Sequence, residues 1–138
     1  MDNKHFHLRL VQGVIDRMSK NSFLVKGWSV LLITGLFALA AENSNIFFIY
    51  IAYFPSVVFW ILDGYYLWQE RLFRGYYDYV RTQDENAIDF SMDCSKAKNQ
   101  IVSWIDTIFS VTLLSFHGVI ILSIFIVMII LLSISINH

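Results

Sequence analysis

The sequence predicts an all-α helical membrane protein with three transmembrane helices, an N-terminal amphipathic helix and cytoplasmic helical extensions of spans two and three. Composition is the first observation behind this prediction, because 57% of the 138 residues are hydrophobic and only 15% are charged. Length is the second, because a helix needs about 20 apolar residues to cross a bilayer core. Three segments meet this requirement, at residues 23–41, 46–67 and 104–136.

The distribution of charge predicts the orientation of these spans. All 10 Lys and Arg residues precede or begin the first span or lie between the second and third, and the turn 42–45 and the tail 137–138 contain none. Basic residues are enriched in cytoplasmic segments. We therefore expect a multi-pass protein of the bacterial inner membrane with a cytoplasmic N-terminus and a periplasmic C-terminus.

The first element is an amphipathic helix over residues 1–22. Apolar side chains recur in it at helical spacing, at Leu8, Val11, Ile15 and Met18. Asn21 and Ser22 then offer a cap for the first span, 23–41. The short polar turn 42–45 predicts that the first two spans form an antiparallel hairpin. The whole chain, 1–138, is expected to be one membrane domain.

The second span, 46–67, contains Pro55, which is expected to kink it because proline removes a backbone hydrogen bond. This helix is expected to continue out of the membrane through Tyr66–Arg81. Its aromatic side chains recur at spacings of three and four, so the extension must bury a face against another part of the protein. The acidic stretch 83–93 is expected to end it, within a cytoplasmic helical loop that covers 68–103.

The third span is longer than the membrane requires. Ser95 is a plausible cap, and one helix from Ser95 to Ile136 is about 60 Å long, twice the hydrocarbon thickness. Either its first third stands in the cytoplasm or the helix breaks. Gly118 is the only glycine in this stretch, so it is the expected position of a break.

Two ionisable residues in the hairpin are expected to form a structural ion pair. Lys26 begins the outgoing span and Asp63 ends the returning one, so both lie at a similar depth. Pairing reduces the cost of holding two charges at the membrane edge. A transport role for the pair, or a Lys26 side chain that extends to the lipid headgroups, are the alternatives. The four Trp residues, Trp60 among them, are interpreted as an aromatic belt at the cytoplasmic interface.

Polar residues on the third helix predict a pore. Six positions share one helical face and are expected to be pore-lining: Ser103, Asp106, Ser110, His117, Ile121 and Ile124. In a ring of subunits this face gives an acidic cytoplasmic mouth and a hydrophobic constriction, which are both common elements of channels. The alternative is that Asp106 caps the helix at the membrane entry and that His117 hydrogen-bonds within a helix bundle.

Basic residues on the cytoplasmic side form a second candidate site. The expected ligand-binding residues are Arg71, Arg74, Arg81, Lys96 and Lys98. Together with neighbouring tyrosines, guanidinium groups suit a nucleotide or a single-stranded oligonucleotide. They equally suit anionic lipid headgroups or pairing with the acidic loop.

Motifs for enzymatic chemistry are absent from the sequence. It has no P-loop, no HExxH, no glycine-rich dinucleotide turn and no nucleophile motif. Its single cysteine, Cys94, forms neither a disulfide framework nor a CxxC pattern and is interpreted as a reduced surface thiol. We therefore expect neither catalytic residues nor a cofactor nor a metal site.

Two segments carry a resemblance to a known group of proteins. These are Arg17–Trp28, with Asn21-Ser22-Phe23-Leu24 and Lys26-Gly27-Trp28, and Phe59–Arg81, with Leu62-Asp63-Gly64-Tyr65-Tyr66-Leu67. They resemble a widespread group of small bacterial membrane proteins, which is similar in size and layout to the membrane effectors of anti-phage defence operons. The candidate within this group is the channel component of the Hailong system. The third span resembles it only in being apolar.

This resemblance implies an oligomeric ion channel controlled by a nucleotide or oligonucleotide that a partner nucleotidyltransferase makes. The expected function is therefore that of a homo-oligomeric channel, with a tetramer favoured, which dissipates the membrane potential during phage infection. The alternative is a non-conducting membrane anchor or adaptor that docks a soluble partner through its cytoplasmic helices. The polar face of the third helix separates the two hypotheses, because an adaptor does not need it.

Overall fold

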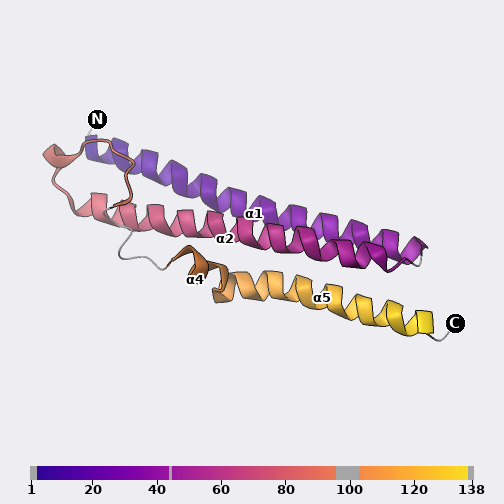
Figure 1. Ribbon diagram of the computed structural model, residues 1–138. Helices are drawn as coiled ribbons and strands as arrows, with labels where there is room; N and C mark the ends of the chain where they lie inside the picture. The colour runs from indigo at the N-terminus through magenta and orange to yellow at the C-terminus, as the bar shows by residue number, and fades with distance from the viewer. Residues whose placement is uncertain (1–2, 44, 96–102, 137–138) are drawn as a thin grey trace.

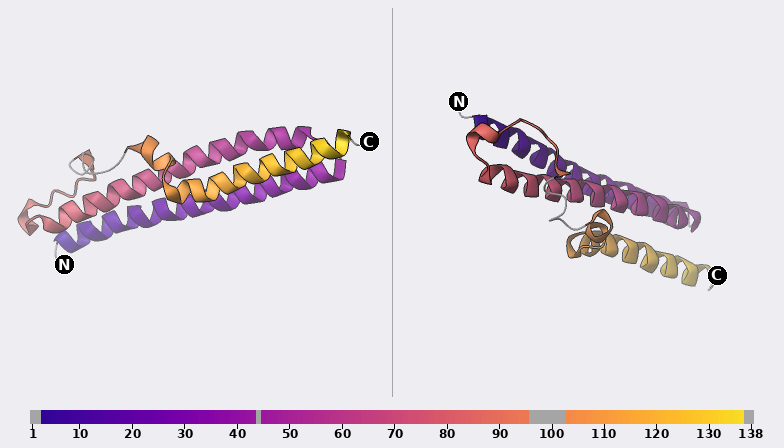
Figure 2. Two further views of the ribbon diagram at one scale, coloured as in Figure 1. Left: turned by 90° about the horizontal axis from the view of Figure 1, so that it is seen from below. Right: turned by 60° about the vertical axis from the view of Figure 1, so that its left-hand side comes forward.

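The computed structural model describes residues 3–43, 45–95 and 103–136, and all the regular elements in these ranges are helices. They follow in the order α1 (Asn3–Asn43), α2 (Phe47–Thr82), the 3₁₀ helix η1 (Glu85–Ala87), α4 (Trp104–Ile108) and α5 (Val111–Ile136). Helices α1 and α2 form a long antiparallel hairpin, and α5 lies along it (Figures 1 and 2). The start of α1 and the end of α5 lie at opposite ends of the molecule.

Three of these helices are long and apolar enough to cross a membrane: α1, α2 and α5. Most of their apolar side chains are exposed, which suits a surface that faces lipid rather than water. The described residues therefore confirm, by helix length and composition, the expectation of an all-helical chain with three helices that can span a membrane.

Helix α1 is continuous, and the prediction of a separate amphipathic helix followed by a capped first span is wrong. The helix runs without interruption from Asn3 to Asn43. Ser22 does not cap a helix, because it lies inside α1 with its hydroxyl bonded to Asp63 of α2. A serine in a helix interior is tolerated where its hydroxyl has a partner, and here that partner comes from another helix.

Helix α2 continues through Pro55 to Thr82, so the predicted helix over Tyr66–Arg81 is present, and its exit from the membrane stays a prediction. The chain between the two long helices is short, and the side chain of Asn45 accepts a hydrogen bond from the amide of Phe47 at the start of α2. Beyond Thr82 the acidic segment leaves the helix, as expected, and contains only the short turn of η1 among its regular elements.

The extension of α2 buries its aromatic face against the beginning of α1. This part of the molecule, residues 3–20, 68–82 and 83–95, is here called the polar end. It has a small core of its own, formed by Val11, Ile15, Leu72, Tyr76, Val80 and Cys94. The expectation that the extension must bury a face is confirmed. Cys94 is buried rather than at the surface, which corrects its interpretation as a surface thiol.

A second core lies toward the other end of the hairpin and includes the third span. Its buried members are Ile33, Ala40, Ile49, Ala52 and Ile124. Ile124 is the contribution of α5, so this helix is attached to the hairpin by apolar packing along part of its length.

The third span breaks, but not where the glycine lies. Helix α4 ends at Ile108 and α5 begins at Val111, whereas Gly118 is within α5. The amide of Ser110 bonds to the carbonyl of Thr107 in a tightened turn, and the carbonyl of Ser110 accepts from the first turn of α5. The helix expected to run on from Ser95 through Lys96 and Lys98 lies outside the described residues.

Candidate functional site

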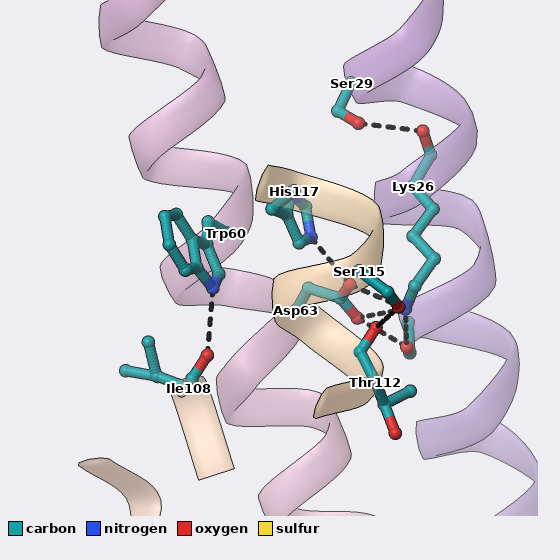
Figure 3. A network of polar contacts seen from close by, with 9 residues as sticks. Lys26, Ser29, Trp60, Asp63, Ile108, Thr112, Ser115 and His117 are labelled. Atoms are coloured by element: carbon teal, nitrogen blue, oxygen red, sulfur yellow. Dashed lines mark hydrogen bonds and ion pairs between the residues drawn. The ribbon is translucent and has the colours of Figure 1, made fainter. Parts of the chain in front are cut away.

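A buried carboxylate joins the three long helices. Asp63 in α2 has an exposed fraction of 0%. Lys26 of α1 places its Nζ 2.6 Å from Asp63 Oδ2 and 2.7 Å from Oδ1, which confirms the predicted ion pair. His117 of α5 places its Nε2 2.8 Å from Oδ2. Figure 3 shows both side chains directed at Asp63, and we call Ser22, Lys26, Asp63 and His117 the polar centre.

The first two members of the polar centre occupy consecutive turns of α1. The hydroxyl of Ser22 donates to Asp63 Oδ1, and it accepts from Lys26 Nζ at 2.8 Å. An ionised carboxylate has only acceptor sites, and here they receive donors from an ammonium, a hydroxyl and an imidazole. A charge in an apolar span persists only when it is compensated in this way. The ion pair is thus the centre of a larger network.

His117 completes the network and retains an unused ring nitrogen. Because the carboxylate of Asp63 can only accept, Nε2 of His117 must carry the hydrogen. Its Nδ1 is buried and has no hydrogen-bond partner among the described residues.

Trp60 connects the polar centre to the break in the third span. Its indole ring is stacked on the imidazole of His117, with the ring centroids 6.0 Å apart and the planes at 7°. Its Nε1 donates to the backbone carbonyl of Ile108 at 3.0 Å, as Figure 3 shows. Ile108 is the last residue of α4, so Trp60 satisfies a carbonyl beside the break.

Gly64 permits the close approach of α4 to α2. A Cβ atom at this position would lie 2.5 Å from Ile108 Cγ1 and 3.4 Å from Ile108 Cα. The first distance is too short for a larger residue unless the side chain of Ile108 moves, and the second shows that the backbone of α4 is already at contact distance. The glycine next to Asp63 therefore sets how close the break lies to the polar centre.

The six predicted pore-lining positions do not share one helical face in the structure. Ser103 and Asp106 are exposed at the start of α4 and hydrogen-bonded to each other, and Ser110 lies in the break. His117 and Ile124 are buried against the hairpin, with exposed fractions of 1% and 0%. The projection onto one continuous helix was wrong because the helix is interrupted. The alternative, in which His117 hydrogen-bonds within the bundle, describes the structure. A pore-lining role of these residues in an assembly stays a prediction.

Three basic residues of the second candidate site, Arg71, Arg74 and Arg81, lie on α2. Arg74 pairs with Glu70 at 2.8 Å and Arg81 with Asp78 at 3.4 Å, both within the helix. Arg71 is partly buried. Lys96 and Lys98 lie outside the described residues. Ion pairs at the surface contribute little to stability, so these arginines can exchange their present partners for a ligand. Ligand binding at these residues stays a prediction.

The polar end contains a further buried polar group, His7 of α1. Its Nε2 lies 3.3 Å from the hydroxyl of Tyr76, which donates to the carbonyl of Ser91 at 2.6 Å. Burial lowers the pKa of His7, and the nearby carboxylate of Asp89 opposes this shift. Burial likewise raises the pKa of Tyr76 and raises that of Cys94 to about 11, so both keep their protons at neutral pH.

Sequence reasoning did not place Ser22, Trp60 or His117 beside Asp63, although hydrogen bonding of His117 within a helix bundle was one of its alternatives. One signal was available, because an isolated imidazole in the most apolar span needs a partner, and Asp63 is the carboxylate within the hairpin spans. Nothing local to Trp60 or Ser22 indicates a role in the polar centre, since both act through contacts with other helices.

No family model, no curated protein and no solved structure matches this chain. The fold and the polar centre nevertheless define a class of protein. The chain has the helices of a small multi-pass membrane protein, and its three candidate spans meet at a buried Lys–Asp–His centre.

Proposed function

We propose that the protein is a homo-oligomeric ion channel of the bacterial inner membrane, with a cytoplasmic N-terminus and a periplasmic C-terminus. In this proposal it is an effector of anti-phage defence that dissipates the membrane potential. The observation that carries the proposal is the attachment of the third span. Helix α5 follows a break at Phe109–Ser110, and a buried imidazole on α5 binds the hairpin at Asp63.

The proposed gate is the contact between His117 and Asp63. Apolar packing of α5 on the hairpin fixes its position only weakly, because lipid tails or another subunit replace such contacts at little cost. A buried charge-assisted hydrogen bond has no such replacement in lipid. Release of His117 from Asp63 would therefore free α5 to turn about the break. Its polar residues could then face the axis of an assembly.

The exposed residues of α4 would then form the mouth of the pore. Asp106 is exposed and held by Ser103, so subunits arranged around the third span would present a ring of carboxylates. Such a ring concentrates cations and disfavours anions. A tetramer is favoured as the assembly. The signal proposed to open it is a nucleotide or single-stranded oligonucleotide from a partner nucleotidyltransferase, bound at Arg71, Arg74, Arg81, Lys96 and Lys98.

Recordings in planar bilayers test the channel directly. We expect currents from the purified protein and a reversal potential that shifts toward lower cation preference in Asp106→Asn. The matched control is Asp16→Asn, an exposed carboxylate at the polar end, which should leave the reversal potential unchanged. A stable monomer in detergent, or unchanged selectivity and conductance in Asp106→Asn, would contradict the proposal.

A non-conducting anchor or adaptor is the second candidate function. The burial of His117 and Ile124 inside the monomer favours it, because these side chains already have partners without an assembly. In this case the polar end, with its separate core, docks a soluble partner. The same bilayer recordings would then give no current, and a partner would co-purify with the wild type but not with a chain altered on the exposed surface of the polar end.

A further inference from the structure

The polar end contains a cavity of about 220 Å³ that is separate from the polar centre. It lies between the start of α1, the end of α2 and the loop that follows. Buried side chains form its floor: His7, Tyr76 and Val80. Exposed carboxylates, Asp89 and Asp93, stand at its rim. The start of α1, which is far away in the sequence, therefore meets the end of α2 and the loop that follows it around one space.

One buried acceptor in this lining has no donor. The hydroxyl of Tyr76 has a single hydrogen, which it donates to the carbonyl of Ser91. The contact between His7 and Tyr76 must therefore use a hydrogen on Nε2 of His7. In the neutral ring this leaves a lone pair on Nδ1, and Nδ1 is buried without a partner among the described residues. Buried polar atoms normally have a partner, so a donor is missing here.

The charged groups of the lining are both acidic. Asp89 accepts from the amide of Ser91 at 3.0 Å, and Asp93 accepts from Ser95. Neither lysine nor arginine is among the lining residues that the structure describes, although Lys4 donates to the backbone carbonyl of Gln83 beside them. This lining repels phosphate and attracts a positively charged group.

Aromatic rings add a second preference for a cation. Tyr76 and Tyr79 both line the cavity and are stacked with their centroids 6.2 Å apart. The face of such a ring attracts an ammonium or guanidinium group. The cavity is smaller than the 300–1,000 Å³ typical of pockets for drug-sized ligands, so its occupant is small.

We propose that this cavity binds a small organic cation of the alkylamine or alkylguanidinium class. Its positive group lies at Asp89 and Asp93, its alkyl part lies on the tyrosine rings, and an N–H supplies the donor that Nδ1 of His7 lacks. Such a ligand connects α1, α2 and the loop. This binding does not depend on ion conduction, so it is tested independently of the proposed channel.

The experiment is isothermal titration of the full-length protein in detergent near neutral pH, with agmatine and putrescine as probes and inorganic phosphate as the comparison. We expect saturable binding of at least one cation and none of phosphate. Asp89→Asn should weaken this binding about tenfold, because it removes a charge-assisted contact. The asparagine oxygen still accepts from the amide of Ser91, so the loop is expected to keep its conformation.

Two further variants make the result specific. His7→Phe preserves an aromatic ring in the floor and removes the acceptor, so it should also weaken binding. Asp78→Asn is the matched control, because this carboxylate is exposed on α2, pairs with Arg81 and does not line the cavity. The proposal is overturned if neither cation binds, if phosphate binds as well as the cations do, or if Asp78→Asn weakens binding as much as Asp89→Asn.

Discussion

The indole N–H of Trp60 in α2 donates to the backbone carbonyl of Ile108, the last residue of α4, at 3.0 Å. A helix that ends inside a membrane protein must satisfy its last carbonyls with groups from elsewhere, and Trp60 provides one such group. Because the same indole is stacked on His117, one side chain stabilises both the break in the third span and the polar centre.

Trp60→Phe should loosen the break while an aromatic ring still covers His117. The lost hydrogen bond is expected to cost about 0.6–1.5 kcal/mol. Hydrogen exchange of the amides in residues 103–110 measures this loss as faster exchange. The control is Trp28→Phe, since Trp28 is exposed on α1. Equal exchange in Trp60→Phe and wild type would show that the hydrogen bond does not hold the break.

Gly64→Ala should force α4 away from α2, because the added Cβ meets Ile108 at 2.5 Å. Overpacking of this kind typically costs about 1–3 kcal/mol. Thermal unfolding in detergent is expected to show a lower midpoint. Gly118→Ala is the control, because nothing lies within 4 Å of its added Cβ, and alanine favours the helix by about 1 kcal/mol. A stable Gly64→Ala protein would mean that α4 moves freely.

Asp63→Asn should be among the most destabilising substitutions in the chain. It leaves the partly buried ammonium of Lys26 without its counter-charge, and loss of one partner of a fully buried pair, which sets the upper bound here, costs about 3–5 kcal/mol. Lys26→Met should cost less, because Ser22 and His117 still donate to the carboxylate. Exchange of the two residues should recover only part of the loss, since it places an ammonium, which has no acceptor site, beside the Nε2 hydrogen of His117. Normal expression and unfolding of both single variants would show that the pair is not structural.

Acidification should weaken the polar end. The pKa of His7 is lowered in the folded protein by burial, so the native state takes up fewer protons than the unfolded chain. Its stabilising contribution is complete above the unfolded pKa of about 6.5 and is lost as pH falls toward the lower, folded value. The groups facing His7 are Tyr76, Phe90 and Asp89, of which Asp89 partly opposes the loss by attracting the imidazolium.

The measurement is hydrogen exchange of residues 66–95 as a function of pH, corrected for the intrinsic exchange rate. The wild type should lose protection below about pH 6.5. His7→Phe should have a flatter profile, because the titrating group is gone. Protection that increases on acidification would contradict this prediction and indicate that Asp89 dominates over burial.

The ion pair of Lys26 and Asp63 could be predicted because it depends on two features that can be read directly from the sequence. The polar turn makes the first two spans antiparallel, and the positions of the residues along the spans then fix their depth. The aromatic face of the α2 extension was predictable for the same reason, since its periodicity requires burial whatever covers it.

The partner of His117 could not be predicted from helical spacing. The spacing was projected along an unbroken helix, and the actual break lies at Phe109 and Ser110, neither of which is a glycine or a proline. The break is stabilised by Trp60, which lies 48 residues from Ile108 in the sequence. For the same reason Ser22 was taken for a cap, because its hydroxyl finds its partner on another helix rather than in the local backbone.

The continuity of α1 has a mechanical consequence. A helix of 41 residues is a rod of about 60 Å, and α2 is a second rod laid against it in the opposite direction. The cavity at His7 and the ion pair at Lys26 lie on the same rod, five turns apart by the 3.6-residue period. A slide of one residue, about 1.5 Å, would separate Lys26 from Asp63 and reshape the cavity at once. The axial register of α1 against α2 therefore affects the cavity and the ion pair together.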